Sequence, residues 1–347
     1  MRVPASRIVR RRLGIAARRL DTMDPSQAIG DLIDRSFPLP AGDPRYGDNS
    51  LAPGDLAIQP SFSELDKDNL RLALEPLGPR VTPLARRNET SREVRRLVSA
   101  CYGGDALRWY DRRSEDWRGS AIDGRAKFGA WFGASFGKGE PRQIKAYYEM
   151  NPAQINSLPH NLQHAARVAM RMLPQLEPLF VSIGCGPRGG AMRVYFYHRG
   201  PLRLLELEPL MHRLGIGHQL PSLLTCLGLI TGGRFVLDGP VLSLRDTRRG
   251  IEMKLEILLG TFPDPPQQMH GLIQMFLAQR PRSQHALRSW LRAMTPDDYT
   301  SPGDMSVVGV RVRPELGARL NIYFRPAGYD QPPSAPTRGP VAHRALA

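Results

Sequence analysis

From about residue 55 onward, the chain repeats one pattern of apolar and polar positions. Two segments in which apolar and polar residues alternate are joined by a short polar turn, and a stretch with apolar residues at helical spacing follows. Alternation with a period of two indicates a strand, and a period near 3.6 indicates a helix. The pattern occurs five times, which predicts five strand–strand–helix units.

These units predict a closed barrel. Ten antiparallel strands interrupted by helices are expected to close on themselves, because closure removes the exposed sheet edges. We therefore expect an α+β fold in which a ten-stranded antiparallel barrel is ringed by helices and is wide enough to hold ligands. The predicted strand pairs span 56–76, 127–150, 178–198, 234–260 and 305–326. The predicted helices span 91–103, 106–113, 161–173, 204–215, 220–230, 268–279 and 283–294.

The segments outside the repeats differ in composition. We expect residues 1–54 to form a basic, partly irregular N-terminal segment, 55–330 the barrel domain, and 331–347 a disordered tail. The first 20 residues carry seven arginines and no acidic residue, which is typical of a solvated or disordered tail. An amphipathic basic helix is the alternative for that segment. Residues 20–54, rich in Pro, Gly, Asp and Ser, are expected to be irregular.

Composition narrows the function further. The net charge of +15 is compatible with a nucleic-acid partner, but no helix-turn-helix, zinc-finger or aromatic RNA-binding signature occurs, and we expect none. No apolar run is long enough to span a bilayer, so a membrane protein is not expected. Cys101, Cys185 and Cys226 are far apart, as in packing residues of a cytoplasmic protein rather than a disulfide framework or a zinc site.

Candidate chemistry follows the second strand of each predicted pair. Residues two apart on a strand face the same side, so a cation and a tyrosine at that spacing project together. One such couplet is compatible with an ordinary solvated face, but cations at the same register on five strands converge on a barrel lumen. The residues concerned are Arg71, Lys145, Tyr147, Arg193, Tyr195, Lys254, Glu256, Arg319, Asn321 and Tyr323.

A lumen lined by cations requires a compensating anion, because buried charges without partners are strongly penalised. The implied ligand is compact and polyanionic, such as a diphosphate. Tyrosine ring faces stabilise a cation and keep water away from it. An allylic diphosphate meets both requirements, since its ionisation gives diphosphate and an allyl carbocation.

On these residues the chain resembles the ABBA-type aromatic prenyltransferases, particularly the dimethylallyltryptophan synthase (indole prenyltransferase) group. The resemblance covers about residues 55–326 and includes the first strand pair, which ends in NLRLALEP. It implies the ABBA barrel (PT barrel) and a bacterial enzyme of secondary metabolism. The implied reaction transfers a dimethylallyl group from dimethylallyl diphosphate to an aromatic ring by Friedel–Crafts alkylation, with no cofactor and no metal.

The resemblance also implies roles for individual residues. Arg71, Lys145, Arg193 and Lys254 would hold the diphosphate, with Arg319 as an addition. Tyr147, Tyr195 and Tyr323 would shield the carbocation, with Tyr197 as a further candidate. The implied partners are the prenyl diphosphate and an indole or tryptophan-type acceptor, and the oligomeric state is left open.

The chain departs from the family pattern in two places. Indole-specific members carry a glutamate on the first strand, whereas the corresponding stretch here reads IQPSF and offers Gln59. A glutamine accepts a hydrogen bond but is a poor base. The fourth couplet has Glu256 where a tyrosine is usual; it is a candidate base, a partner for a cationic substrate group, or simply an ion-pair partner of Lys254. Both departures leave a tyrosine, a phenol or a peptide open as the acceptor.

The sequence lacks the features of two other enzyme classes and of a protein that only binds polyanions. The stretch SIGCGPRGG at 182–190 resembles the glycine-rich loop of an S-adenosylmethionine-dependent methyltransferase, but the residues after it predict a strand where that loop requires a helix. Metal-dependent isoprenoid synthases use DDxxD motifs, and the pair Asp297–Asp298 does not complete one. A barrel that only binds polyanions would scatter its cations over outer faces.

Overall fold

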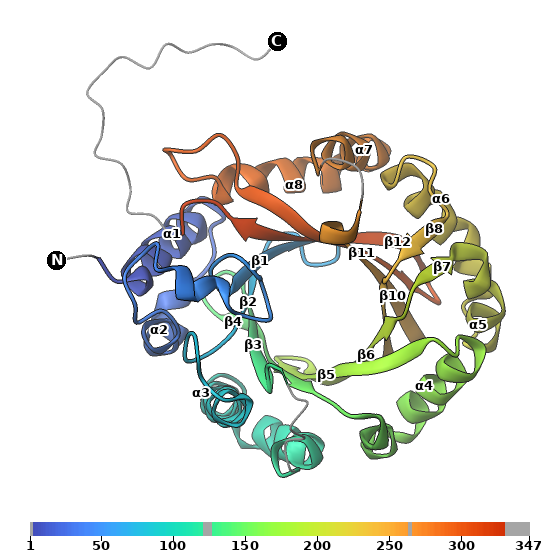
Figure 1. Cartoon of the computed structure of the whole chain (residues 1–347), viewed down its shortest axis with the longest axis horizontal. Coiled ribbons are helices and arrows are strands. Elements are labelled where there is room, and N and C mark those ends of the chain that lie inside the picture. The colour runs from blue at the N-terminus through green and yellow to red at the C-terminus, as the bar shows by residue number, and fades with distance from the viewer. Residues whose placement is uncertain (1–2, 121–126, 263–265, 330–347) are drawn as a thin grey trace.

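The structure of the chain is a computed structural model that describes residues 3–120, 127–262 and 266–329. Ten strands form one closed antiparallel barrel in the order β1-β12-β11-β10-β9-β6-β5-β4-β3-β2 (Figure 1). The strands are β1 (Ile58–Ser63), β2 (Leu70–Leu74), β3 (Ala130–Phe136), β4 (Pro141–Glu149), β5 (Leu176–Gly186), β6 (Gly189–His198), β9 (Val241–Thr247), β10 (Gly250–Leu258), β11 (Gly303–Arg313) and β12 (Leu316–Pro326). The predicted fold class is therefore confirmed.

Helices surround the barrel (Figure 1). They are α1 (Ala5–Arg19), α2 (Pro25–Ser36), α3 (Pro83–Arg118), α4 (His160–Met172), α5 (Leu207–Arg213), α6 (Leu220–Ile230), α7 (Pro266–Ala278) and α8 (Pro281–Met294). Short 3₁₀ helices are η1 (Pro44–Gly47), η2 (Pro152–Ser157), η3 (Leu204–Glu206), η4 (Gly217–Gln219) and η5 (Leu259–Thr261). Within the described residues, no helix is both long and apolar enough to cross a membrane.

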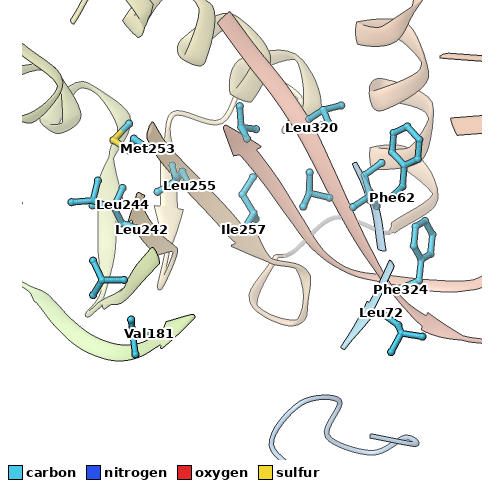
Figure 2. Packing of buried hydrophobic residues seen from close by; sticks show 14 of the residues in the cluster. Phe62, Leu72, Val181, Leu242, Leu244, Met253, Leu255, Ile257, Leu320 and Phe324 are labelled. Atoms are coloured by element: carbon cyan, nitrogen blue, oxygen red, sulfur yellow. The ribbon is translucent and has the colours of Figure 1, made fainter. Parts of the chain in front are cut away.

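The hydrophobic core lies between the barrel wall and the helices. Apolar residues alternate along the strands and point outward, as a barrel with a polar interior requires. On α8, Trp290 packs against Phe62 of β1 and Phe324 of β12, with ring centroids 6.3 and 5.0 Å away. Figure 2 shows part of this layer, including Leu242 of β9 and Leu255 of β10.

The N-terminal segment is ordered, and its interpretation as a solvated tail is wrong. It forms α1, an amphipathic helix that buries Ile8, Val9 and Leu13. The alternative interpretation is thus the correct one. Residues 25–36, expected to be irregular, form α2, which starts with Pro25 in its first turn and with Asp24 accepting a hydrogen bond from the Ser26 amide at 2.8 Å.

Two arginines of α1 form ion pairs with the segment that precedes β11. Arg12 donates to both carboxylate oxygens of Asp298 at 2.9 and 3.1 Å, and Arg19 pairs with Asp297. The two aspartates that fail to complete an isoprenoid synthase motif therefore have a structural role. The predicted C-terminal tail, 331–347, lies outside the described residues.

The fourth strand pair is shorter than predicted. Residues 236–238 leave the barrel and form β8 (Val236–Asp238), which pairs with β7 (Pro201–Arg203) in a separate two-stranded sheet. The break has a backbone cause. Gly239 has a positive φ of 56°, and Pro240 has no N–H to donate to a neighbouring strand.

Candidate functional site

Four of the five predicted cations, Arg71, Lys145, Arg193 and Lys254, line the inside of the barrel. Cross-strand partners in an antiparallel sheet point to the same face, and the partners of these cations are small or polar. Arg71 lies opposite Ser61 and Ser135, Lys145 opposite Gly133 and Gly184, Arg193 opposite Ser182, and Lys254 opposite Ser243 and Arg311. A cavity within the lumen is lined by Gln59, Ser61, Arg71, Ala73, Ser135, Lys145, Tyr147 and Tyr323 among others.

These cations repel one another. Burial, followed by the charges of Arg71, Lys254, Arg193 and Arg311, lowers the pKa of Lys145 well below its ordinary value. Burial and then the nearby Arg311 lower the pKa of Arg193. Burial also lowers the pKa of Lys254, even though Glu256 acts in the opposite direction. The described residues therefore leave an excess of positive charge in this enclosed space.

Glycines make room for the Lys145 side chain. A Cβ on Gly184 would lie 2.6 Å from Lys145 Cβ, and a Cβ on Gly133 would lie 2.9 Å from Lys145 Cε and 2.8 Å from the ring of Tyr147. Any larger residue at either position would displace this cation. Gly184 belongs to the stretch SIGCGPRGG, whose turn joins β5 to β6. That stretch is a hairpin, and it does not provide the strand-to-helix loop of a methyltransferase.

Lys254, Glu256 and Tyr323 form a hydrogen-bonded group. Lys254 Nζ pairs with Glu256 Oε1 and donates to Tyr323 Oη at 3.1 Å. The expected ion pair between Glu256 and Lys254 is therefore present. The pKa of Tyr323 is raised by burial and by the Glu256 charge, so its phenol stays neutral.

Aromatic rings form a cluster beside the cations. Tyr195 lies 4.3 Å from Phe180 and 6.2 Å from Tyr147, between ring centroids. The cations approach these ring faces: Lys145 Nζ is 4.8 Å from the centroid of Tyr147, and Lys254 Nζ is 5.4 Å from that of Tyr195 and 5.5 Å from that of Tyr323. Tyr197 packs, partly buried, against the same cluster. All four predicted tyrosines therefore adjoin the lumen cations or this cluster.

The two remaining candidates differ in position. Gln59 lines the cavity, where its amide donates to Ser306 Oγ at 3.0 Å. Arg319 does not join the cations described above. It donates to the carbonyl oxygen of Ala318 at 2.9 Å, and burial together with the charge of Arg280 lowers its pKa.

Several lumen residues were missed by the sequence reasoning. Arg245 on β9, and Arg311 and Arg313 on β11, lie on the first strands of their pairs, whereas the repeated couplets lie on the second strands. Glu252 on β10, two residues before Lys254, is fully buried and pairs with Arg193, Arg311 and Arg313. Alternation along β10 was a signal that could have placed Glu252 in the lumen.

The aromatic cluster also contains residues that the sequence reasoning missed. Phe128 stacks on Trp131 at 3.9 Å, and Trp131 lies 5.4 Å from Phe180. Trp131 Nε1 donates to Glu75 Oε2 at 3.1 Å, and Arg86 pairs with the other oxygen of that carboxylate at 2.8 Å. Glu75 is the next-to-last residue of the stretch NLRLALEP, and these two contacts commit its carboxylate to protein partners.

Two further observations concern the rest of the chain. Within the described residues, no three His, Cys, Asp or Glu side chains are grouped so as to hold a metal ion. A hollow between η2 and α4, lined by His160, His164, Arg167 and others, opens on the outside of the barrel and shares no lining residue with the lumen cavity.

No family model matches the chain, and no curated protein matches it. Solved structures are similar to it over nearly its whole length. A structure of 6-dimethylallyl tryptophan synthase is 15% identical, with a TM-score of 0.73 over 95% of this chain and 98% of that chain. The 6-dimethylallyltryptophan synthase from Micromonospora olivasterospora, in complex with DMASPP and Trp, is 14% identical, with a TM-score of 0.71 over 94% and 98%. The prenyltransferase PriB, in a binary complex with product diphosphate, is 15% identical, with a TM-score of 0.71 over 94% and 97%. The resemblance predicted from the sequence is thus confirmed for the fold, and the chain has the ten-stranded ABBA barrel of the aromatic prenyltransferases.

Proposed function

We propose that the protein is a metal-independent aromatic prenyltransferase, which transfers a dimethylallyl group from dimethylallyl diphosphate to an indole or tryptophan-type acceptor. The observation that carries this proposal is the excess of buried positive charge next to a cluster of aromatic rings. Lys145 has a strongly lowered pKa, and its ammonium group lies 4.8 Å from the ring of Tyr147. A bound diphosphate would relieve this repulsion. The similar structures that hold product diphosphate, or DMASPP with Trp, support the proposal.

The cations would act on the leaving group. When the C–O bond of dimethylallyl diphosphate breaks, its electron pair leaves with the diphosphate, whose charge Arg71, Lys145, Arg193, Lys254 and Arg311 stabilise. Preorganised charges in a site that excludes water are more effective than the same charges in bulk water. They supply the positive charge that ionisation requires, so the proposed reaction proceeds in EDTA.

The tyrosines would protect the carbocation that remains. The faces of Tyr147, Tyr195 and Tyr323 carry negative electrostatic potential, which stabilises a cation above them. Phe180 and Tyr197 extend this lining. Because burial raises the pKa of Tyr147 well above its ordinary value, its hydroxyl remains protonated and is a poor nucleophile toward the carbocation.

Capture by the acceptor completes the reaction. The ring carbon of the acceptor forms the new C–C bond, and the ring then loses one proton to restore its aromaticity. We assign the acceptance of that proton to Glu256, which lies at the junction of the cations and the tyrosines, and hydrogen bonding to the acceptor N–H or O–H to Gln59. Gln59 is suited to this second role because an amide accepts a hydrogen bond without taking the proton.

The test is incubation of the purified protein with dimethylallyl diphosphate and separate acceptors in EDTA. L-tryptophan, a tryptophan-containing dipeptide, L-tyrosine and a simple phenol are analysed by mass spectrometry for a gain of one dimethylallyl group. Prenylated tryptophan or dipeptide is expected. Product only with tyrosine or the phenol would replace the acceptor assignment, and product that depends on added magnesium would contradict the metal-independent reaction.

A further inference from the structure

We propose that Arg193, Arg311 and Arg313 form an oxyanion subsite that the carboxylate of Glu252 occupies in the free protein. The subsite would take a phosphate group of the diphosphate, and Glu252 would act as an internal competitor that limits its affinity. This inference rests on the proposed function for its ligand. It adds a residue that opposes binding to a lumen whose cations promote it.

The first observation is the position of Glu252. Its side chain is fully buried, and it contacts three arginines that come from two other strands of the barrel. Arg193 on β6 and Arg313 on β11 each pair with one of its oxygens, and Arg311 Nε lies 3.4 Å from Oε1. A carboxylate held by several guanidinium groups has the same donor arrangement that phosphate oxygens receive from arginine.

The second observation is that one carboxylate does not satisfy these cations. Arg245 lies opposite Glu252 in the sheet and adds a fourth guanidinium group. Its Nε is buried and has no hydrogen-bond partner within the described parts of the chain. Burial and the charges of Arg311 and Arg313 lower the pKa of Arg245. The group therefore keeps a net positive charge and unused donors while Glu252 is in place.

The third observation is the continuity of this group with the rest of the lumen. Arg193 also donates to Ser243 Oγ at 3.1 Å, and Ser243 is the cross-strand partner of both Tyr195 and Lys254. Arg311 is the other cross-strand partner of Lys254. A diphosphate bound by Lys254 and Arg193 would thus lie beside the arginines that Glu252 holds, and its charge would repel that carboxylate.

The consequence is a balance between two anions. In the free protein Glu252 offsets part of the repulsion among the arginines, which stabilises the fold. In the complex the negative charge of the same carboxylate repels the diphosphate. This repulsion weakens the binding of the diphosphate product. Removal of its charge should therefore destabilise the free protein and tighten the complex.

The test is calorimetric titration with inorganic diphosphate in EDTA, together with thermal unfolding with and without that ligand. Glu252→Gln keeps the shape and removes the charge. We expect it to lower the Tm of the free protein and to lower the Kd for diphosphate about tenfold or more. The matched control is Glu93→Gln. Glu93 is equally buried and pairs with Arg35, Arg92 and Arg96, but it lies on α3 outside the barrel. This variant should lower the Tm and leave the Kd unchanged.

An unchanged or higher Kd in Glu252→Gln would overturn the proposal, because it would show a residue that only positions the arginines. If that variant does not fold, the same titration is made with Arg313→Gln. It should raise the Kd for diphosphate about tenfold, and an affinity equal to that of the unaltered protein would also overturn the subsite. Neither measurement needs prenyl transfer, so a failure of the proposed reaction would be seen separately in the product assay.

Discussion

Buried carboxylates surrounded by arginines occur in two regions of the molecule. Outside the barrel, Glu89 and Glu93 of α3 together pair with Arg35, Arg92 and Arg96, and these arginines are partly exposed to water. Inside the barrel, Glu252 alone meets three arginines that are largely buried.

The two regions differ in whether their positive charges are matched by acids. The outer cations are matched by nearby acids, so their ion pairs serve the stability of the fold. Among the residues that the structure describes, the inner cations outnumber their acids in an enclosed space, where unbalanced charge is costly. We propose that a bound anion offsets this cost, which favours the lumen as the ligand site.

The largest effect is expected from removing a lumen cation. Lys145→Met should lower kcat/KM for dimethylallyl diphosphate by about 10²–10³-fold, the range found when one charge-stabilising group is deleted from an active site. The free protein should be as stable as before or more stable, because a repelled charge has been removed. Steady-state kinetics and urea unfolding measure the two quantities, and a variant that is unstable yet fully active would reverse the comparison.

The opposite result, a loss of stability with little change in activity, is expected from removing a cation outside the barrel. Arg12→Met removes the two hydrogen bonds from Arg12 to Asp298 and leaves that carboxylate without them. It should lower the free energy of unfolding by about 1–3 kcal/mol and leave kcat/KM within about twofold. A drop in kcat/KM as large as that of Lys145→Met would show that outer charges also serve catalysis.

A second comparison uses two arginines that are cross-strand partners, Arg311 and Arg319. Arg311 lowers the pKa of Lys145, whereas Arg319 hydrogen-bonds to its own hairpin. Arg311→Gln should raise the KM for dimethylallyl diphosphate by about tenfold or more, and Arg319→Gln should raise it less. An equal rise in KM for the two variants would show that Arg319 belongs to the diphosphate site, as the sequence predicted.

A smaller effect is expected at Gly184. A methyl group there would overlap Lys145 Cβ at 2.6 Å, so Gly184→Ala should displace the lysine and raise the KM severalfold. Gly271→Ala on α7 is the matched control, since its added methyl group meets no atom within 4 Å. That change should leave the KM unaltered and slightly stabilise the helix. An unaltered KM in Gly184→Ala would mean that Lys145 adapts without loss of binding.

The smallest effect is expected in the pH dependence of stability. Because the pKa of Lys145 is lowered in the folded protein, the unfolded chain binds more protons between that pKa and the ordinary 10.5. Stability should therefore rise with pH across that range, and the rise should be smaller in Lys145→Met. Diphosphate binding should take up a fraction of a proton, measured by calorimetry in buffers of different ionisation enthalpy. An identical pH slope in the two proteins would contradict the lowered pKa.

Most of the barrel could be predicted because each strand pair is local in sequence and has its own turn. The short pairing of β7 with β8 could not, since it joins strands of only three residues that lie far apart in the sequence. The N-terminal helix had a readable signal, the apolar stripe of Ile8, Val9 and Leu13 between the arginines. The seven arginines of the first 20 residues favoured a solvated tail over that apolar stripe as the interpretation.

The site was predictable only in part, for a related reason. Arg193 and Tyr195 stand in a repeated couplet, which a sequence displays directly. Arg311 and Glu252 take their importance from neighbours on other strands, and that depends on the register of the closed sheet. Arg319 is the opposite case. It stands in the repeated couplet, yet its side chain turns toward its own hairpin.

A crystal structure of the protein with dimethylallyl S-thiolodiphosphate, grown in EDTA, is the most direct measurement of what the lumen binds. We expect the diphosphate group inside the barrel, in contact with Lys145, Arg193 and Lys254, and the dimethylallyl group against Tyr147 and Tyr195. An analogue bound only in the outer hollow at α4, or a lumen without it at saturating concentration, would contradict the proposed prenyl transfer.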